Sequence, residues 1–193
     1  MSRVFVILAG GSGTRFWPAS TDEQPKQFLK LFGDKPMIEL AVDRVKDLVP
    51  LENIFIVTSA QHADHPYIKG LIPAENVLFE PEQKDTAAAV TLATAVVRRR
   101  FGNPAMGILT ADHLIDPVNE FQREMSYAMD AVEQENSIYA FGIMPTEPST
   151  AYGYLKLGEL LKETHGIEHY KLEEFREKPD LATAEAFYHN GQH

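Results

Sequence analysis

The stretch VFVILAGGSGTRFWPASTDEQPKQFLKL, residues 4–31, decides the fold of this chain. It begins with an apolar, β-branched segment, residues 4–8, that runs into closely spaced glycines. This pattern is typical of a buried strand that ends in a loop of bare backbone. Because glycine has no Cβ and tolerates positive φ, successive amides in such a loop can converge on a phosphate group. We therefore predict an anion-binding loop formed by Leu8, Gly10, Gly11, Ser12, Gly13 and Thr14.

Two common phosphate-binding motifs do not fit this loop. A P-loop requires Gly-Lys-Ser/Thr after the first glycines, whereas Gly13 is followed by Thr14 and Arg15. A dinucleotide-binding fingerprint requires a third small residue at the position of Phe16, where a bulky ring would hold the following helix away from the strand. The loop is therefore neither a Walker A motif nor a dinucleotide motif.

Two cations accompany the glycines. Arg15 follows them directly, and Lys26 follows after a connection that Pro18 and Pro25 stiffen. A guanidinium and an ammonium are thus available to one polyphosphate. The alternative is a glycine-rich turn with solvated basic residues, which a bare Gly-Gly-x-Gly pattern fits equally well. The length of the whole motif favours the phosphate site.

The composition limits the classes of protein to which the chain can belong. Its 193 residues are 44% hydrophobic, enough for one sizeable core, and the absence of cysteine excludes disulfides and thiolate chemistry. The formal net charge of −10 argues against nucleic-acid binding, because proteins that bind the phosphate backbone present basic faces. The apolar run at residues 4–9 is too short for a signal peptide or a membrane span. We therefore expect a cytoplasmic protein with no nucleic-acid partner and no membrane association.

Apolar periodicity predicts an alternation of strands and helices along the chain. The expected strands are residues 4–8, 54–58, 76–79, 105–110, 137–143 and 170–175. The expected helices are residues 37–48, 61–71, 87–100, 119–135 and 181–188. Asp85 or Thr86 is the expected N-cap of the third helix, Asn119 that of the fourth, and Gly191 ends the last. This order predicts a three-layer α/β fold with a Rossmann-like, mostly parallel sheet.

A carboxylate lies directly after the strand expected at residues 105–110. Ligands of open parallel sheets bind where strands end, so Asp112 is well placed to hold a divalent cation. Mg²⁺ usually takes one or two protein carboxylates together with phosphate oxygens and water, so a single aspartate is sufficient. The alternative is an ordinary turn aspartate. His62 and His65 lack a third metal ligand in the sequence, and we interpret them as surface residues.

The motif GGSGTRFWPAS, residues 10–20, followed by PKQFLKL, residues 25–31, closely resembles the signature of the sugar-phosphate nucleotidyltransferases. Within that family it is similar to the mannose-1-phosphate guanylyltransferases. Members that activate glucose 1-phosphate usually carry Leu-Thr and Pro-Lys-Pro/Ala-Leu at the corresponding places. The mannose type is indicated by Trp17, Pro18, Ser20, Gln27 and Phe28. The resemblance implies that GTP and mannose 1-phosphate are the partners of this chain.

The resemblance also implies base and metal contacts. In the family, Glu-Pro followed by Asn-Thr-Ala-Pro lines the base pocket, which implies that Glu80, Asp85 and Thr86 contact the base or the ribose. Asp85 stands where the family usually has Asn, and helix capping accounts for Asp85 and Thr86 equally well. Residues 110–113, Thr-Ala-Asp-His, resemble the family's Pro-Ala-Asp-His, whose aspartate binds Mg²⁺. The resemblance therefore implies Mg²⁺ as the cofactor, held by Asp112.

Two later motifs resemble the sugar-binding part of the family. The family reads Gly-Tyr-Gly-Tyr-Ile around the position of Gly153 and Phe-x-Glu-Lys-Pro around Glu177 and Lys178. In the family the carboxylate binds sugar hydroxyls and the ammonium binds the phosphate of the sugar. Gly153, Glu177 and Lys178 are therefore implied as sugar-phosphate-binding residues. A strand glycine that marks a β-bulge is the alternative for Gly153.

Together these resemblances imply transfer of GMP from GTP to mannose 1-phosphate, with GDP-mannose and pyrophosphate as products. Arg15 would act on the polyphosphate and Lys26 near the reacting phosphate, as the catalytic residues. One alternative is a sister enzyme that uses glucose 1-phosphate. Another, from a different class, is a nucleotide-binding module with little turnover.

Family members continue beyond the position of His193 into a further strand, more helices and a second metal-binding aspartate. We therefore expect one nucleotidyltransferase domain over residues 1–193, truncated at its C-terminal end. Such a truncation would leave a sheet edge unpaired, so either self-association into a homo-oligomer or partial disorder near the C-terminus is expected.

Overall fold

The computed structural model describes residues 2–11, 16–21 and 23–191. The chain divides into two compact units, Met1–Ser137 and Ile138–His193, which we call unit 1 and unit 2. The expectation of one truncated nucleotidyltransferase domain over residues 1–193 stays a prediction.

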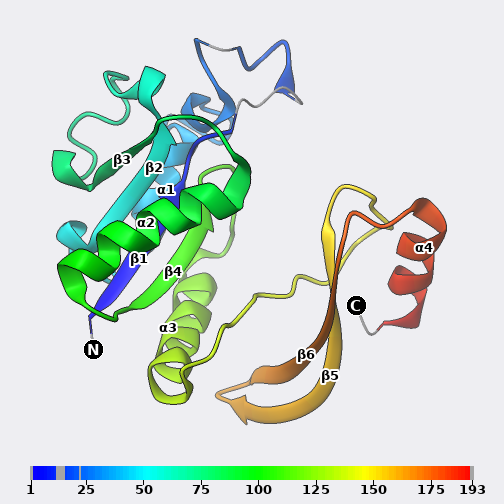
Figure 1. Cartoon of the computed structure of the whole chain (residues 1–193). Coiled ribbons are helices and arrows are strands. Elements are labelled where there is room, and N and C mark those ends of the chain that lie inside the picture. The colour runs from blue at the N-terminus through cyan, green and yellow to red at the C-terminus, as the bar shows by residue number, and fades with distance from the viewer. Residues whose placement is uncertain (1, 12–15, 22, 192–193) are drawn as a thin grey trace. The chain divides into compact units, whose positions relative to one another are not determined.

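Unit 1 is built on a four-stranded parallel sheet with the strand order β3-β2-β1-β4 (Figure 1). The strands are β1 (Arg3–Leu8), β2 (Ile54–Ser59), β3 (Val77–Glu80) and β4 (Ala105–Thr110). Parallel neighbours need long crossover connections, which the predicted alternation of strands and helices provides. Because all four strands run the same way, their carboxyl ends meet at one edge of the sheet. The predicted parallel sheet is confirmed.

Helices cover both faces of this sheet, with α1 (Met37–Val45) and α3 (Val118–Glu135) on one face and α2 (Asp85–Phe101) on the other (Figure 1). Successive side chains of a strand point to opposite faces. Along β1, Phe5 therefore packs with α1 and α3, whereas Val6 packs with α2. Within the described residues, no helix combines the length and the apolar character needed to cross a membrane. The three-layer α/β fold is confirmed.

The first turns of α2 and α3 differ from the predicted ones. Lys84 is the N-cap residue of α2 and Pro117 that of α3, and neither makes a side-chain capping hydrogen bond. The predictions that Asp85, Thr86 or Asn119 cap these helices are therefore wrong, because all three lie inside a first turn. A cap contributes only about 1 kcal/mol, so the preceding loop can decide where a helix begins.

The helix predicted for residues 61–71 is absent. This segment forms the short 3₁₀ helix η4 (Ala60–His62), which is followed by turns. Pro66 explains the difference, because proline lacks a backbone N–H and disfavours the α conformation at the preceding residue. Gly70 then takes a φ of 79°, outside the right-handed helical region. Apolar spacing alone overestimated this helix.

Unit 2 contains an antiparallel hairpin formed by β5 (Gly153–Thr164) and β6 (Ile167–Glu177). It is much longer than the strand predicted at residues 170–175. His165 and Gly166 lie between the two strands with φ values of 52° and 80°. A two-residue turn with two positive φ angles matches the twist of a hairpin. Sequence analysis missed this turn because His-Gly is a weaker signal than Asn-Gly or Asp-Gly.

The predicted last helix is confirmed as α4 (Leu181–Asn190). Asp180 caps it, because its Oδ1 accepts a hydrogen bond from the Thr183 backbone N–H at 2.8 Å. Gly191 follows at the C-cap with a φ of 64°, as predicted.

The strand predicted for residues 137–143 is absent from the described structure. Its apolar residues Ile138 and Ile143 are 99% and 86% exposed, so they are not packed as those of a buried strand would be. No strand among the described residues pairs with this segment. A strand exists only beside a hydrogen-bonded neighbour, which apolar alternation cannot supply by itself.

Candidate nucleotide-binding site

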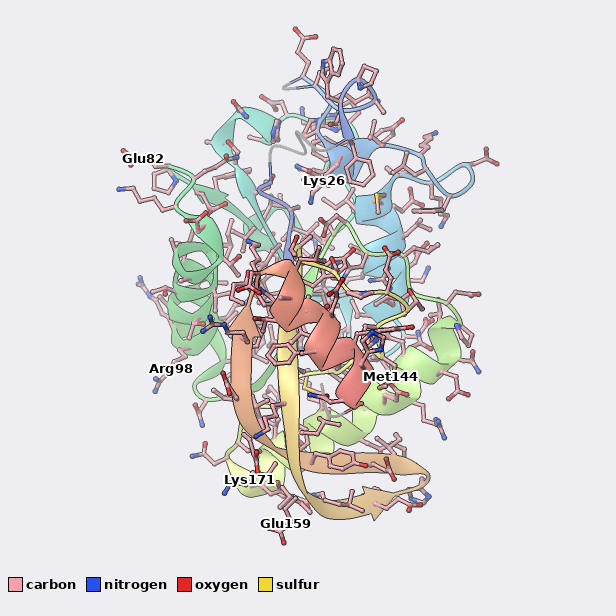
Figure 2. All side chains as sticks on the ribbon, turned by 90° about the vertical axis from the view of Figure 1, so that its right-hand side faces the viewer. Lys26, Glu82, Arg98, Met144, Glu159 and Lys171 are labelled. Carbon is pink, nitrogen blue, oxygen red and sulfur yellow. The ribbon has the colours of Figure 1, made fainter. Side chains whose placement is uncertain are left out.

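A cavity of about 460 Å³ opens at the carboxyl edge of the sheet in unit 1. All four strands contribute to it near their carboxyl ends, through Leu8, Val57, Glu80 and Thr110. Its volume suits a small-molecule ligand, and open α/β sheets bind ligands at this edge. Lys26, labelled in Figure 2, begins the short 3₁₀ helix η2 (Lys26–Phe28) and lines the same cavity. The cavity is therefore the candidate site of unit 1.

The start of the glycine loop lines this cavity through Gly10 and Gly11. The carbonyl of Ala9 accepts hydrogen bonds from Gln27 Nε2 at 2.8 Å and from Thr58 Oγ1 at 3.0 Å. Both side chains are buried, so the loop leaves β1 in a fixed direction. The described part of the chain does not include the predicted site residues Ser12, Gly13, Thr14 and Arg15.

Glu80, the last residue of β3, places its carboxylate against Gly10. A Cβ at position 10 would meet Glu80 Oε2 well inside van der Waals contact, so a larger residue there would displace the Glu80 carboxylate. Glu80 is only 8% exposed, and burial raises the pKa of its carboxyl above the ordinary value. Among the described residues, none forms an ion pair or a hydrogen bond with this carboxylate. Glu80 is thus a buried acceptor at the cavity wall.

The segment that leads into α2 closes another side of the cavity. Gln83 donates from Nε2 to the Gly10 carbonyl at 2.5 Å, so it holds the glycine loop. Sequence analysis missed Gln83, and its place between Glu80 and Thr86 was the one available signal. Asp85 and Thr86 line the cavity in the first turn of α2. Free backbone N–H groups at a helix N-terminus favour an anionic ligand there.

Lys26 and Asp112 meet at the cavity. Lys26 Nζ donates to Asp112 Oδ2 and forms an ion pair with it. The side chain of each residue is 23% exposed. Burial alone would raise the pKa of the Asp112 carboxyl, but the hydrogen bond and the charge of Lys26 outweigh it, so this pKa lies below its ordinary value. The structure thus joins the predicted catalytic cation to the predicted metal ligand.

Asp112 is the single carboxylate that this side of the cavity offers to a cation. The described residues contain no group of three or more His, Cys, Asp or Glu placed to hold a metal. Mg²⁺ tolerates such a site because it keeps several waters and takes phosphate oxygens. Gln27 Oε1 is buried, belongs to a residue that lines the cavity, and has no hydrogen-bond partner among the described residues. It can accept a hydrogen bond from metal-bound water, so the donor set fits hydrated Mg²⁺.

Comparison with known proteins agrees with this geometry. The family model described as nucleotidyl transferase matches residues 4–193. The chain belongs to the nucleotidyl transferase family. The xanthan biosynthesis protein XanB of Xanthomonas campestris pv. campestris is 36% identical over 192 residues, which cover 97% of this chain and 39% of XanB. A mannose-1-phosphate guanylyltransferase of Escherichia coli is 35% identical over 190 residues, which cover 94% of this chain and 40% of that protein.

Two solved structures resemble this nucleotidyl transferase. The crystal structure of a mannose-1-phosphate geranyltransferase from Thermus thermophilus is 33% identical, with a TM-score of 0.87 over 99% of this chain and 54% of that chain. A UDP-glucose pyrophosphorylase in complex with UDP-glucose is 20% identical, with a TM-score of 0.59 over 94% of this chain and 71% of that chain, and supports the fold alone. The chain spans 39% and 40% of the length of the two curated relatives named above.

The predicted sugar-side residues of the nucleotidyl transferase lie together in unit 2. Gly153 and Glu177 are paired across the open end of the hairpin. A Cβ at position 153 would meet the Phe175 ring and Glu177 Oε2, so both side chains lie close over this glycine. The register irregularities of the hairpin begin only after Lys156, so Gly153 does not mark a bulge. Lys178 Nζ lies 3.2 Å from Glu177 Oε1, and the sugar-binding roles of these residues stay predictions.

Lys26 is carried by the short 3₁₀ helix η2 (Lys26–Phe28), which aromatic packing anchors. The fully buried Phe28 stacks on His65, with ring centroids 3.6 Å apart, and meets the edge of His62 at 5.5 Å. His62 is 7% exposed, so its interpretation as a surface residue is wrong. Packing against Phe28 buries it, and residue spacing does not reveal that contact.

We expect the nucleotidyl transferase to lose stability as the pH falls below about 6.5, the ordinary pKa of histidine. Burial lowers the pKa of His62, and burial together with the charge of His62 lowers the pKa of His65. These side chains bind protons more readily in the unfolded chain than in the folded one. The free energy of unfolding therefore decreases as the pH falls from about 6.5 through the lowered pKa values of the two folded histidines. Thermal unfolding followed by circular dichroism should give a lower midpoint at about pH 5.5 than at about pH 7.5, on either side of that ordinary pKa. The drop should shrink in His65→Phe, and an equal drop in both proteins would contradict this prediction.

Proposed function

We propose that this nucleotidyl transferase transfers GMP from GTP to mannose 1-phosphate, with GDP-mannose and pyrophosphate as products. The observation that carries the proposal is the cavity in which Gly10, Gly11, Lys26 and Asp112 meet at the carboxyl edge of the sheet. A relative that is 35% identical over 94% of this chain is named mannose-1-phosphate guanylyltransferase, which supports the choice of substrates.

The proposed reaction is an in-line displacement at phosphorus. A phosphate oxygen of mannose 1-phosphate attacks the α-phosphorus of GTP, and the bond to the bridging oxygen of the β-phosphate breaks to release pyrophosphate. The attacking phosphate is largely ionised at neutral pH because its second pKa is about 6, so it needs no general base. The barrier arises chiefly from the approach of two anions. The Lys26 ammonium and the glycine amides can lower it by offsetting phosphate charge.

Further residues of each unit are assigned to the two substrates. We assign Arg15 to the polyphosphate, Glu177 to sugar hydroxyls and Lys178 to the phosphate of the sugar, because a guanidinium or an ammonium pairs with phosphate and a carboxylate accepts from hydroxyls. Asp112 would hold Mg²⁺, which when bound supplies further neutralisation of the phosphate charge. Asp85 and Thr86 would contact the base or the ribose from the start of α2.

The buried carboxylate of Glu80 supports guanine as the base. It has no partner among the described residues, and it lines the cavity. Guanine presents N1–H and N2–H₂ side by side, and one carboxylate can accept from both. Adenine presents an unprotonated N1 at the same place, which repels a carboxylate. GTP is therefore the proposed nucleotide.

The test is product formation by the chain itself. The protein is incubated with Mg²⁺, GTP and mannose 1-phosphate, and GDP-mannose and pyrophosphate are quantified. Parallel reactions use glucose 1-phosphate as the acceptor and UTP or ATP as the nucleotide. We expect the highest kcat/KM for GTP with mannose 1-phosphate. A higher kcat/KM for glucose 1-phosphate would identify the sister enzyme, and GTP binding without any product would identify a nucleotide-binding module.

A further inference from the structure

The Lys26 ammonium is paired with the carboxylate of Asp112, the residue proposed to hold the metal. The ion pair joins Nζ of Lys26 to Oδ2 of Asp112, in a setting where each side chain is 23% exposed. A divalent cation bound at Oδ2 would occupy the same space and carry the same sign of charge. In partly buried surroundings, two cations at one carboxylate oxygen repel strongly. Lys26 and a metal ion therefore oppose one another at Asp112, at Oδ2 directly and at Oδ1 through the repulsion of two nearby cations.

The charged side chains that line the cavity determine how much this repulsion affects ligand binding. The described residues that line the cavity carry three carboxylates, on Glu80, Asp85 and Asp112, and one ammonium, on Lys26. Arg15, which lies outside the described residues, is not counted in this balance. A polyphosphate meets the acidic side chains of this wall, and the charge of Lys26 is largely neutralised while Asp112 engages it. A divalent cation meets the Lys26 ammonium at Asp112, so the ion pair is an obstacle to either ligand alone.

The Lys26 ammonium can reach a second position without a change in its backbone. Its backbone is fixed, because the adjacent Gln27 is tied to the Ala9 carbonyl at 2.8 Å and Phe28 is fully buried. Its stem passes the glycine loop, so that a Cβ at Gly11 would lie 3.4 Å from Lys26 Cε. Rotation about the flexible stem can therefore carry Nζ from Asp112 to an anion held beside Gly10 and Gly11. No movement of the backbone is required.

We propose that Lys26 and a divalent cation compete for Asp112, and that polyphosphate binding releases Asp112 by drawing the Lys26 ammonium to itself. The inference rests on the proposed function only in taking a polyphosphate and a divalent cation as ligands. It makes the two ligands mutually dependent, because each removes the obstacle that the other meets. Such coupling is reciprocal: the polyphosphate raises the affinity for the metal by the same factor as the metal raises that for the polyphosphate.

The first test measures metal binding without any nucleotide. Mn²⁺ is titrated into the wild-type chain and into Lys26→Met, which keeps the length of the stem and removes the charge, and free Mn²⁺ is followed by electron paramagnetic resonance. We expect Kd for Mn²⁺ to fall by about tenfold in Lys26→Met, a typical size for a coupling between ligands. Lys30→Met, which changes an exposed lysine on the same segment, should leave Kd unchanged. The double variant Lys26→Met/Asp112→Asn should not show this tighter Mn²⁺ binding.

The second test measures tripolyphosphate binding in EDTA. Asp112→Asn frees Lys26, so we expect it to bind tripolyphosphate about tenfold more tightly than the wild type. In the presence of Mn²⁺ the order should reverse, because the variant has lost the metal ligand. A mere loss of a structural ion pair would weaken binding under both conditions. Circular dichroism verifies folding, and Lys26→Gln and Asp112→Ala replace any variant that does not fold.

Either of two results would overturn the inference: Mn²⁺ affinity in Lys26→Met equal to or weaker than in the wild type, or tripolyphosphate affinity in Asp112→Asn that does not rise in EDTA. Neither measurement uses guanine or a sugar. Product assays that fail while both affinity shifts occur would therefore reject the proposed substrates and leave the competition for Asp112 in place. GDP-mannose formation without the two affinity shifts would support the proposed substrates and reject the competition for Asp112.

Discussion

Lys26→Ala is expected to lower kcat for GDP-mannose formation by about 10²–10³-fold, the size of the loss of one preorganised electrostatic contact with a transition state. Lys26 is the one cation among the described residues that line the cavity, and Gln27 and Phe28 hold its backbone in place. Its charge should matter most as negative charge redistributes around the α-phosphorus. Steady-state kinetics should therefore show the loss in kcat, with a smaller change in KM.

Lys30→Ala is the matched control for this variant. Lys30 lies on the same segment, but it is exposed and its ammonium sits over the Tyr67 ring, 5.5 Å from the centroid. We expect kcat of this control to stay within about twofold of the wild type, since surface substitutions away from such sites have small effects. A Lys26→Ala enzyme that keeps a kcat near that of the control would show that Lys26 is a solvated cation without a role in transfer. The same comparison can be made for Arg15→Ala.

Glu80→Gln is expected to reduce the preference for GTP over ATP by about 10–100-fold, because a hydrogen bond to a charged group contributes about 1.5–3 kcal/mol. The amide keeps the shape of the side chain but replaces one acceptor oxygen by a donor. It can no longer accept from both N1–H and N2–H₂ of guanine. Calorimetric titration with GTP and with ATP would measure the two affinities. Glu82→Gln, which alters an exposed neighbour paired with Lys84 at 3.0 Å, is the control.

The same variant should be at least as stable as the wild type at neutral pH. Burial raises the pKa of Glu80, so its ionised form costs stability above that pKa, and the neutral amide removes this cost. The thermal midpoint of Glu80→Gln should therefore not fall at neutral pH. Unchanged nucleotide selectivity together with a lower midpoint would mean that Glu80 serves the fold rather than the base.

Local pattern was sufficient for the elements that nucleotide binding requires. The apolar segment before the glycines became β1, whose four central residues are buried, because a parallel strand covered on both faces is apolar along its length. The short apolar run at residues 105–110 became β4, which is only partly buried at the edge of the described sheet. The position of Asp112 then followed from the rule that ligands bind at the carboxyl ends of parallel strands. Segments without such strong signals were mispredicted, as the proline-interrupted residues 61–71 show.

Contacts between distant segments could not be predicted in this way. The sequence shows that Lys26 and Asp112 carry opposite charges, but only the packing of η2 against Ala9 and of β4 beside β1 brings them to one ion pair. Likewise, the sequence shows an acidic residue at position 80, whereas its burial against Gly10 depends on the neighbouring strands.

The chain's own pattern of strands, glycines and charges thus determined the sheet, the edge at which the candidate site lies and the chemical types of residue present there. Tertiary structure decided which charges neutralise one another, which oxygens stay without a partner and which histidine is buried. The physical reason is the sequence separation over which each effect acts. Periodicity and turn chemistry act between residues a few positions apart. Burial and charge pairing depend on neighbours that folding alone brings together.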